Sequence, residues 1–181
     1  MKLVITQHTT SEWNAVGRIQ GQTDISLNSR GRADALRLGA ALSGLKIDFI
    51  VSSDLKRAKE TASAINTVLN LPLRFDDRLR ECSFGKIEGL TEQQVVDKYG
   101  AQIIPSFSDQ YRNYDFRPFG GERREDVLVR HMEVLNSLVK TDTANIPLLV
   151  GHGLGMNTLL HSLGYDAGLK QGEFQIIEFT I

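Results

Sequence analysis

The stretch Lys2-Leu-Val-Ile-Thr6, followed by Gln7-His8-Thr9-Thr10-Ser11, decides how the rest of the chain is interpreted. Aliphatic residues that end abruptly at polar ones are typical of a strand buried inside a parallel sheet. His8 then stands at the carboxyl end of this strand, where open α/β sheets place their binding sites. A histidine at a strand end can also be structural and bond a backbone carbonyl, so His8 alone does not identify a site.

Strands and helices alternate along the remaining chain. After a long polar connection over residues 7–28, we predict strands at 48–52, 72–75, 146–150 and 173–181. We predict helices at 29–42, at 54–69 with Ser53 or Asp54 as cap, and at 91–99, 122–140 and 153–163. This alternation indicates an α/β domain with a mostly parallel sheet. Residues 100–121 hold two of the four prolines and no clear period, so we interpret about 82–121 as a small insertion over the active site.

Composition limits the classes of protein that this chain can belong to. Its 181 residues suit one domain, 1–181, with a single hydrophobic core. A net charge of -1 provides no overall field for nucleic acid or anionic lipid, so any anion site must be local. The one cysteine, Cys82, excludes an internal disulfide and fits a reducing compartment, and no apolar stretch is long enough for a membrane span. We therefore expect a cytoplasmic protein of unknown oligomeric state, monomer or homodimer.

Chemically active residues follow the predicted strand ends. The second strand leads into Ser53 and Arg57, the loop after the third strand carries Glu81, and the fourth strand ends at His152. Parallel strands end at the same edge of a sheet, so these residues can converge on His8. An arginine fork suits phosphate oxygens, imidazoles offer a nucleophile and a donor, and a carboxyl group can protonate a leaving alkoxide.

Five blocks of sequence, in order, resemble the histidine phosphatase superfamily, also called phosphoglycerate mutase-like. They are His8 with Glu12-Trp13-Asn14 and Gly17-Arg18-Ile19-Gln20-Gly21; Ser52-Ser53-Asp54-Leu55 with Arg57-Ala58; Leu79-Arg80-Glu81; Arg117-Pro118 with Gly120-Gly121-Glu122; and Gly151-His152-Gly153. The resemblance covers nearly the whole chain. It implies a three-layer α/β/α sandwich and phosphoryl transfer through a phosphohistidine.

The resemblance also implies a role for each site residue. His8 is the nucleophile, and Glu81 protonates the leaving oxygen and then activates water. The phosphate-binding set is Gln7, Asn14, Gln20, Arg57 and His152. No cofactor and no metal ion are expected, because cationic side chains supply the charge that phosphoryl transfer needs.

Two residues depart from the family pattern, which usually begins Arg-His-Gly. Gln7 replaces the arginine, and the loss of a charge-assisted contact is expected to weaken the enzyme by roughly ten- to hundred-fold. Thr9 replaces the glycine, and a threonine would be strained if this position requires a positive φ. His131 and His161 lie outside the matched blocks and are interpreted as structural or solvent-facing. Arg112, Tyr114 and Arg117 are candidates for substrate recognition, against the alternative that this segment is structural.

Three functions remain open from the sequence. The first is a hydrolase of a small phosphorylated metabolite that works through phosphohistidine. The second is a phosphoglycerate or phosphosugar mutase, which the short chain and small insertion disfavour. The third is an inactive relative that binds a phosphorylated ligand, with Gln7 and Thr9 as signs of decay. Retention of an acid at Glu81 argues against the third, because a binding protein does not need one.

Overall fold

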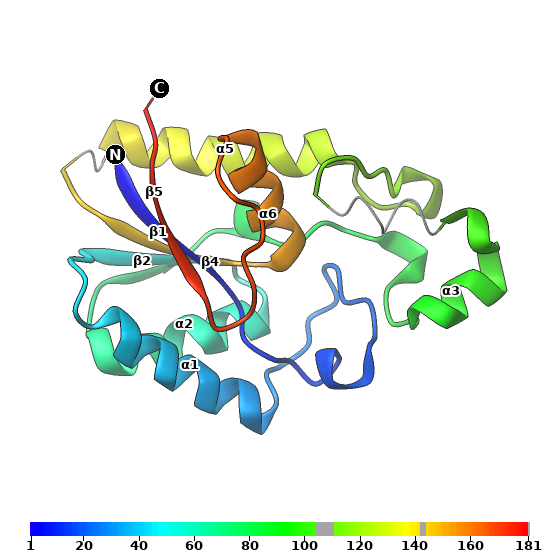
Figure 1. The fold of residues 1–181 in the computed structure, drawn as a ribbon, viewed down its shortest axis with the longest axis horizontal. Helices are drawn as coiled ribbons and strands as arrows, with labels where there is room; N and C mark the ends of the chain where they lie inside the picture. The colour runs from blue at the N-terminus through cyan, green and yellow to red at the C-terminus, as the bar shows by residue number, and fades with distance from the viewer. Residues whose placement is uncertain (104–110, 142–143, 181) are drawn as a thin grey trace.

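The computed structural model describes residues 1–103, 111–141 and 144–180, and its centre is a five-stranded sheet (Figure 1). The strands are β1 (Lys2–Gln7), β2 (Phe49–Ser52), β3 (Leu73–Phe75), β4 (Pro147–Gly151) and β5 (Phe174–Glu178). Their spatial order is β3-β2-β4-β1-β5, and only β5 runs antiparallel to its neighbour among these strands. The predicted α/β fold with a mostly parallel sheet is confirmed.

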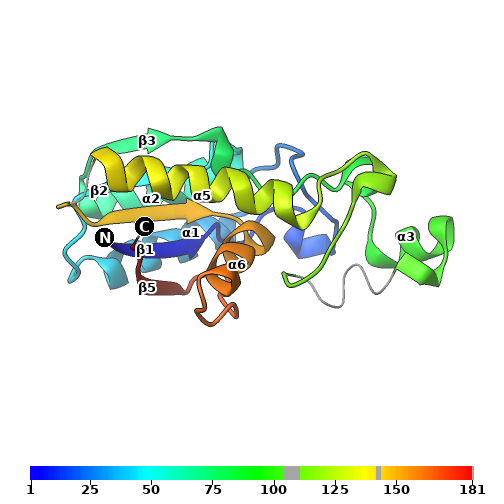
Figure 2. The same cartoon turned by 90° about the horizontal axis from the view of Figure 1, so that it is seen from above.

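Helices cover both faces of this sheet, which gives three layers (Figures 1 and 2). The helices of the described residues are α1 (Ser29–Leu42), α2 (Lys56–Leu69), α3 (Glu92–Tyr99), α5 (Arg124–Thr141) and α6 (Gly153–Ser162). One face of the sheet packs against α1 and α2, for example Ile50 against Leu38 and Ile65. The other packs against α5 and α6, for example Ile5 against Leu135 and Leu159. Alternate residues of one strand therefore enter opposite cores, as the period of a strand requires.

The predicted insertion forms its own small core beside the sheet. Helix α3 begins with a capping box, in which Thr91 and Gln94 satisfy each other's backbone N–H groups. Two short 3-10 helices, Ala101–Ile103 and Arg117–Phe119, lie before and after residues 104–110, which are outside the described ranges. A third hydrophobic cluster holds these pieces together; it consists of Cys82, Ile87, Val95, Ile103, Tyr114, Phe116 and Val127. Figure 2 shows α3 projecting beyond the edge of the three layers.

The start of α2 differs from the sequence prediction. We expected Ser53 or Asp54 to cap it, but Leu55 is the N-cap residue and provides no side-chain cap. Asp54 instead accepts hydrogen bonds from Arg80, at 2.7 Å from its Nε, which lowers the pKa of Asp54. Ser53 is buried and its hydroxyl lies 2.8 Å from His152. Both candidate cap residues therefore make tertiary contacts at the sheet edge instead of capping α2.

The loop after β1 is fixed by close contacts with α1 and α2. The Thr9 hydroxyl donates to the Gly31 carbonyl at 2.8 Å, and the Thr9 backbone N–H donates to the hydroxyl of Thr61. Among the described residues only Asn70 combines a side chain with a positive φ, so Thr9 is not strained. The expected difficulty with threonine at this position does not arise.

Gly31 provides the test of this packing. An added Cβ at Gly31 would overlap the Thr10 carbonyl, whereas one at Gly44 would meet nothing within 4 Å. We expect Gly31→Ala to lower the free energy of unfolding by about 1–3 kcal/mol, the usual cost of overpacking. Gly44→Ala, the matched control, should cost less than about 0.5 kcal/mol. Urea unfolding measures both variants, and equal effects would show that the contact between α1 and the loop is not a tight one.

Candidate active site

A cavity of about 260 Å³ lies where the carboxyl ends of the parallel strands meet. The sequence-predicted residues that line it are Gln7, His8, Asn14, Gln20, Arg57 and Glu81. His152 packs beside them, with its ring centre 5.2 Å from that of His8. The structure thus brings the proposed catalytic and phosphate-binding residues to one place, as the convergence of strand ends predicts.

His8 is arranged as a neutral nucleophile. Its Nδ1 lies 2.7 Å from the Thr9 carbonyl oxygen, which assigns the ring proton to Nδ1 and leaves the lone pair on Nε2. Burial, together with the positive charge of Arg57, lowers the pKa of His8 to about 3. Around neutral pH the ring is therefore uncharged and Nε2 can attack an electrophile.

Arg57 and His152 each present a buried N–H without a partner among the described residues. The guanidinium of Arg57 is fully buried and donates to the carbonyls of Gly21 at 2.6 Å and Thr23 at 2.9 Å, which leaves Nε unpaired. The hydroxyl of Ser53 accepts the Leu55 N–H, so its proton can go to Nε2 of His152. The ring proton of His152 then sits on Nδ1, which is also unpaired. An anion beside His8 would satisfy such donors.

One serine orients the two amide side chains of the cavity. The Ser11 hydroxyl lies 2.7 Å from the Gln20 Oε1 and 2.9 Å from the Asn14 Oδ1, and the Ser11 backbone N–H also donates to Asn14. Because these contacts engage the amide oxygens, the NH2 groups of Asn14 and Gln20 are the ends left for the cavity. Sequence analysis did not select Ser11, since a serine in a polar loop carries no distinctive signal.

Glu81 is held by the beginning of α6. Its Oε1 accepts the N–H groups of Cys82 and Gly155, both at 2.9 Å, and its Oε2 accepts the N–H of Leu154 at 3.1 Å. The side chain is 8% exposed. Oε2 receives one hydrogen bond where Oε1 receives two, so Oε2 is the oxygen with room to carry a proton.

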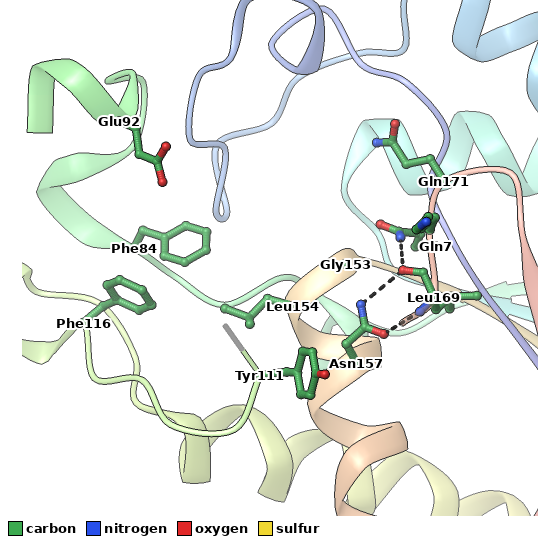
Figure 3. Close-up of a pocket in the computed structure, with 11 residues that line it drawn as sticks. Gln7, Phe84, Glu92, Tyr111, Phe116, Gly153, Leu154, Asn157, Leu169 and Gln171 are labelled. Carbon is green, nitrogen blue, oxygen red and sulfur yellow. Dashed lines mark hydrogen bonds between the residues drawn. The ribbon is translucent and has the colours of Figure 1, made fainter. Parts of the chain in front are cut away.

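Gln7 makes a contact that the sequence did not suggest. Its amide nitrogen donates to the Leu169 carbonyl at 2.7 Å, and its Oε1 faces Gly153 (Figure 3). The residue that stands in place of an arginine therefore ties β1 to the loop before β5. Arg18 is a second arginine in the cavity lining, and its guanidinium donates to the Gly89 carbonyl. Sequence analysis quoted Arg18 in a motif without giving it a role.

The three candidates for substrate recognition lie outside the lining of this cavity and of the larger one beside it. Tyr114 is buried in the insertion core and its hydroxyl lies 3.1 Å from that of Thr158. Arg117 pairs with Asp115 on the surface, and Arg112 lies over the ring of Tyr111. Their placement is a correction to our expectation, because none of them faces either cavity.

His131 was expected to be structural or solvent-facing, and its burial fits the first of these two alternatives. It is fully buried on α5, and its Nδ1 lies 2.9 Å from the Val127 carbonyl oxygen. An added Cβ on Gly155 would lie 2.7 Å from its Nε2, so the ring packs directly on the start of α6. Burial lowers the pKa of His131 to about 3. The role of His131 is structural, as a support for the helix end that holds Glu81.

Two kinds of feature are absent from the described residues. No group of three or more histidine, cysteine, aspartate or glutamate side chains within the described ranges is placed to hold a metal ion. None of the helices in that part of the chain combines the length and apolar composition that crossing a bilayer requires.

Fold and site together define an α/β protein in which a buried histidine and a buried arginine line a cavity at the carboxyl ends of the parallel strands. The model of the histidine phosphatase superfamily, branch 1, matches residues 3–178. The chain belongs to this superfamily.

Several proteins are similar to this chain in sequence or in fold. "Probable phosphoglycerate mutase GpmB" of Salmonella paratyphi A is 32% identical over 168 residues, which cover 90% of this chain and 74% of the relative. The mycobacterial glucosyl-3-phosphoglycerate phosphatase, solved with VO3, superposes with a TM-score of 0.84 at 29% identity over 98% of this chain and 92% of its own. Bacillus stearothermophilus YhfR reaches a TM-score of 0.85 at 29% identity, over 99% and 91%.

The buried neutral histidines predict a loss of stability in acid. The pKa values of His8 and His131 fall to about 3, and that of His152 well below 6.5, the value expected in an unfolded chain. Between pH 6.5 and pH 3 the unfolded state therefore binds protons that the folded state excludes. Stability should fall as the pH decreases, by up to about 1.4 kcal/mol per pH unit for each histidine.

Replacing one buried histidine tests this. In urea unfolding between pH 7 and pH 4.5, His131→Gln should make the fall shallower by up to about 1.4 kcal/mol per pH unit. The exposed His161 serves as the control, and His161→Gln should leave the slope unchanged. Identical slopes in both variants would mean that His131 takes up a proton in the folded protein.

Proposed function

We propose that this protein hydrolyses a small phosphomonoester through a phosphohistidine formed on His8. The observation that carries the proposal is that a neutral His8 lies near two buried N–H groups, Nε of Arg57 and Nδ1 of His152, which have no hydrogen-bond partner among the described residues. A phosphoryl group at Nε2 of His8 would supply the acceptor oxygens that such donors lack. Membership of the superfamily and its phosphatase relatives support the same chemistry.

The reaction has two steps. Nε2 of His8 attacks phosphorus, the bond from phosphorus to the ester oxygen breaks, and Glu81 gives its proton to the leaving alkoxide. A water then attacks the phosphohistidine while Glu81 takes its proton, and the bond between phosphorus and Nε2 breaks. Asn14 and Gln20 add neutral donors to the equatorial oxygens. Positioning and electrostatics supply most of the catalysis in such transfers.

Gln7 makes this a weakened enzyme relative to one with an arginine beside His8. Glutamine is uncharged, so Gln7 adds no positive charge at the phosphate. Its amide nitrogen instead donates to the Leu169 carbonyl at 2.7 Å. Arg57 and Arg18 are the arginines that line the cavity. A phosphoglycerate or phosphosugar mutase is the second candidate, supported by the name of the Salmonella relative. If the protein hydrolyses no phosphomonoester, the remaining alternative is a protein that only binds phosphorylated ligands.

Trapping the intermediate tests the proposal. Brief incubation with a phosphate-labelled aryl phosphomonoester should place label on His8, in a bond that is stable to base and labile to acid. His8→Asn should remain unlabelled, and the matched control His161→Asn should label like the natural chain. Chelators should leave turnover unchanged. Label at another residue, or turnover that a chelator abolishes and a divalent ion restores, would contradict the mechanism.

The role of Glu81 has its own test. Glu81→Gln should lower kcat/KM, which reports the phosphorylation step and not the later attack of water, by about 10²- to 10⁴-fold on alkyl phosphates, the usual contribution of a positioned acid. Aryl phosphates should lose less than about tenfold, because a phenolate leaves with little protonation. Glu125→Gln, at an exposed position on α5, is the control. Equal losses on the two substrate classes would assign Glu81 a different role.

A further inference from the structure

A second cavity, of about 590 Å³, adjoins the one at His8. The two share four lining residues, which are Gln7, Phe84, Gly153 and Gln171. Its volume lies within the range of about 300–1,000 Å³ that small-molecule sites occupy. Because the cavities are continuous, a substrate with its phosphate at His8 would place the rest of its structure here (Figure 3).

The amide side chains in this lining already bond the protein. The nitrogens of Gln7 and Asn157 both donate to the Leu169 carbonyl, and the Asn157 Oδ1 accepts the Leu169 N–H (Figure 3). The Gln171 nitrogen donates to Asn14, and its oxygen accepts from Thr10. These amides hold the loop before β5 in place as a wall. Five of their six amide nitrogen and oxygen atoms take part in these bonds, and the Gln7 Oε1 faces Gly153.

The remaining wall is mainly aromatic and aliphatic. Phe84 and Phe116 pack edge to face, with ring centres 4.7 Å apart and planes at 85°. Tyr111, Leu154 and Leu169 extend the apolar surface. The edge-to-face pair makes this part of the wall stiff, which suits a flat ring better than a flexible polar chain.

Charged residues of this lining balance one another. Glu92 and Lys170 are both exposed residues that contribute to the cavity, one negative and one positive. The described residues of the lining therefore contribute one negative and one positive charge, which gives no net positive charge among them for a second anionic group. A phosphoglycerate or a sugar phosphate would leave its carboxylate or hydroxyl groups facing apolar side chains.

We infer that the substrate is a phosphomonoester of an alcohol that carries an apolar ring, and that the ring binds against the partly exposed side chains of Phe84 and Leu154. The inference rests on the proposed hydrolase function and adds the class of its substrate. Transfer of an apolar ring from water to the apolar part of this wall supplies the binding energy.

Matched primary alkyl esters test the inference. Phosphate release should give a kcat/KM at least about tenfold higher for 3-phenylpropyl phosphate than for glycerol 1-phosphate, as burial of a phenyl ring allows. Leu154→Asn should reduce this ratio at least fivefold. The ratio cancels any effect on Glu81, which bonds the Leu154 backbone. Tyr111→Ser is a second variant of the wall, and Leu36→Asn, at an exposed position on α1, should leave the ratio unchanged.

Binding of phosphonates separates this inference from the proposed function. Calorimetry with 4-phenylbutylphosphonate and 3,4-dihydroxybutylphosphonate requires no turnover. Tighter binding of the phenyl compound, lost in Leu154→Asn, supports the substrate class even if neither ester is hydrolysed, and in that case only the hydrolase proposal fails. Equal binding, or tighter binding of the dihydroxy compound, overturns the substrate class and leaves the hydrolase proposal standing if phosphate is released.

Discussion

The buried guanidinium of Arg57 is the constraint on which the site depends. A cation without access to water is costly unless its surroundings compensate for it. Burial lowers the pKa of Arg57, while the negative charges of Glu81, Asp24 and Glu88 act to raise it. The carbonyls of Gly21 and Thr23 complete the surroundings, and this fixes the long connection between β1 and α1 against α2. The same charge helps to lower the pKa of His8, so one buried arginine affects both the shape of the loop and the protonation of His8.

The sequence predicted the fold because the relevant signals are local. Helix α1 spans Ser29–Leu42, as its apolar spacing indicates, and α3 begins at Glu92 directly after Thr91, its N-cap residue. The convergence of His8, Arg57 and Glu81 follows from the order of the strands. The use of Ser53 was not predictable in this way: its hydroxyl could cap α2, and only the tertiary fold directs it to His152.

Residues that act through other residues escaped the sequence analysis for a related reason. Ser11 orients Asn14 and Gln20, but nothing in a single chain distinguishes it from an ordinary loop serine. Tyr114 was a candidate for substrate contact, yet its ring belongs to the core of the insertion. Gln7 could be recognised from the sequence as a departure from the family. Its bond to Leu169 could not, because the two residues are 162 positions apart. Long-range partners of this kind are set by the whole fold.

Leu154 belongs to two parts of the molecule at once. Its backbone N–H holds the Glu81 carboxylate, and the residue also lines the larger cavity. A substitution at Leu154 that shifts its backbone would therefore reshape the cavity wall and move the Glu81 carboxylate at the same time.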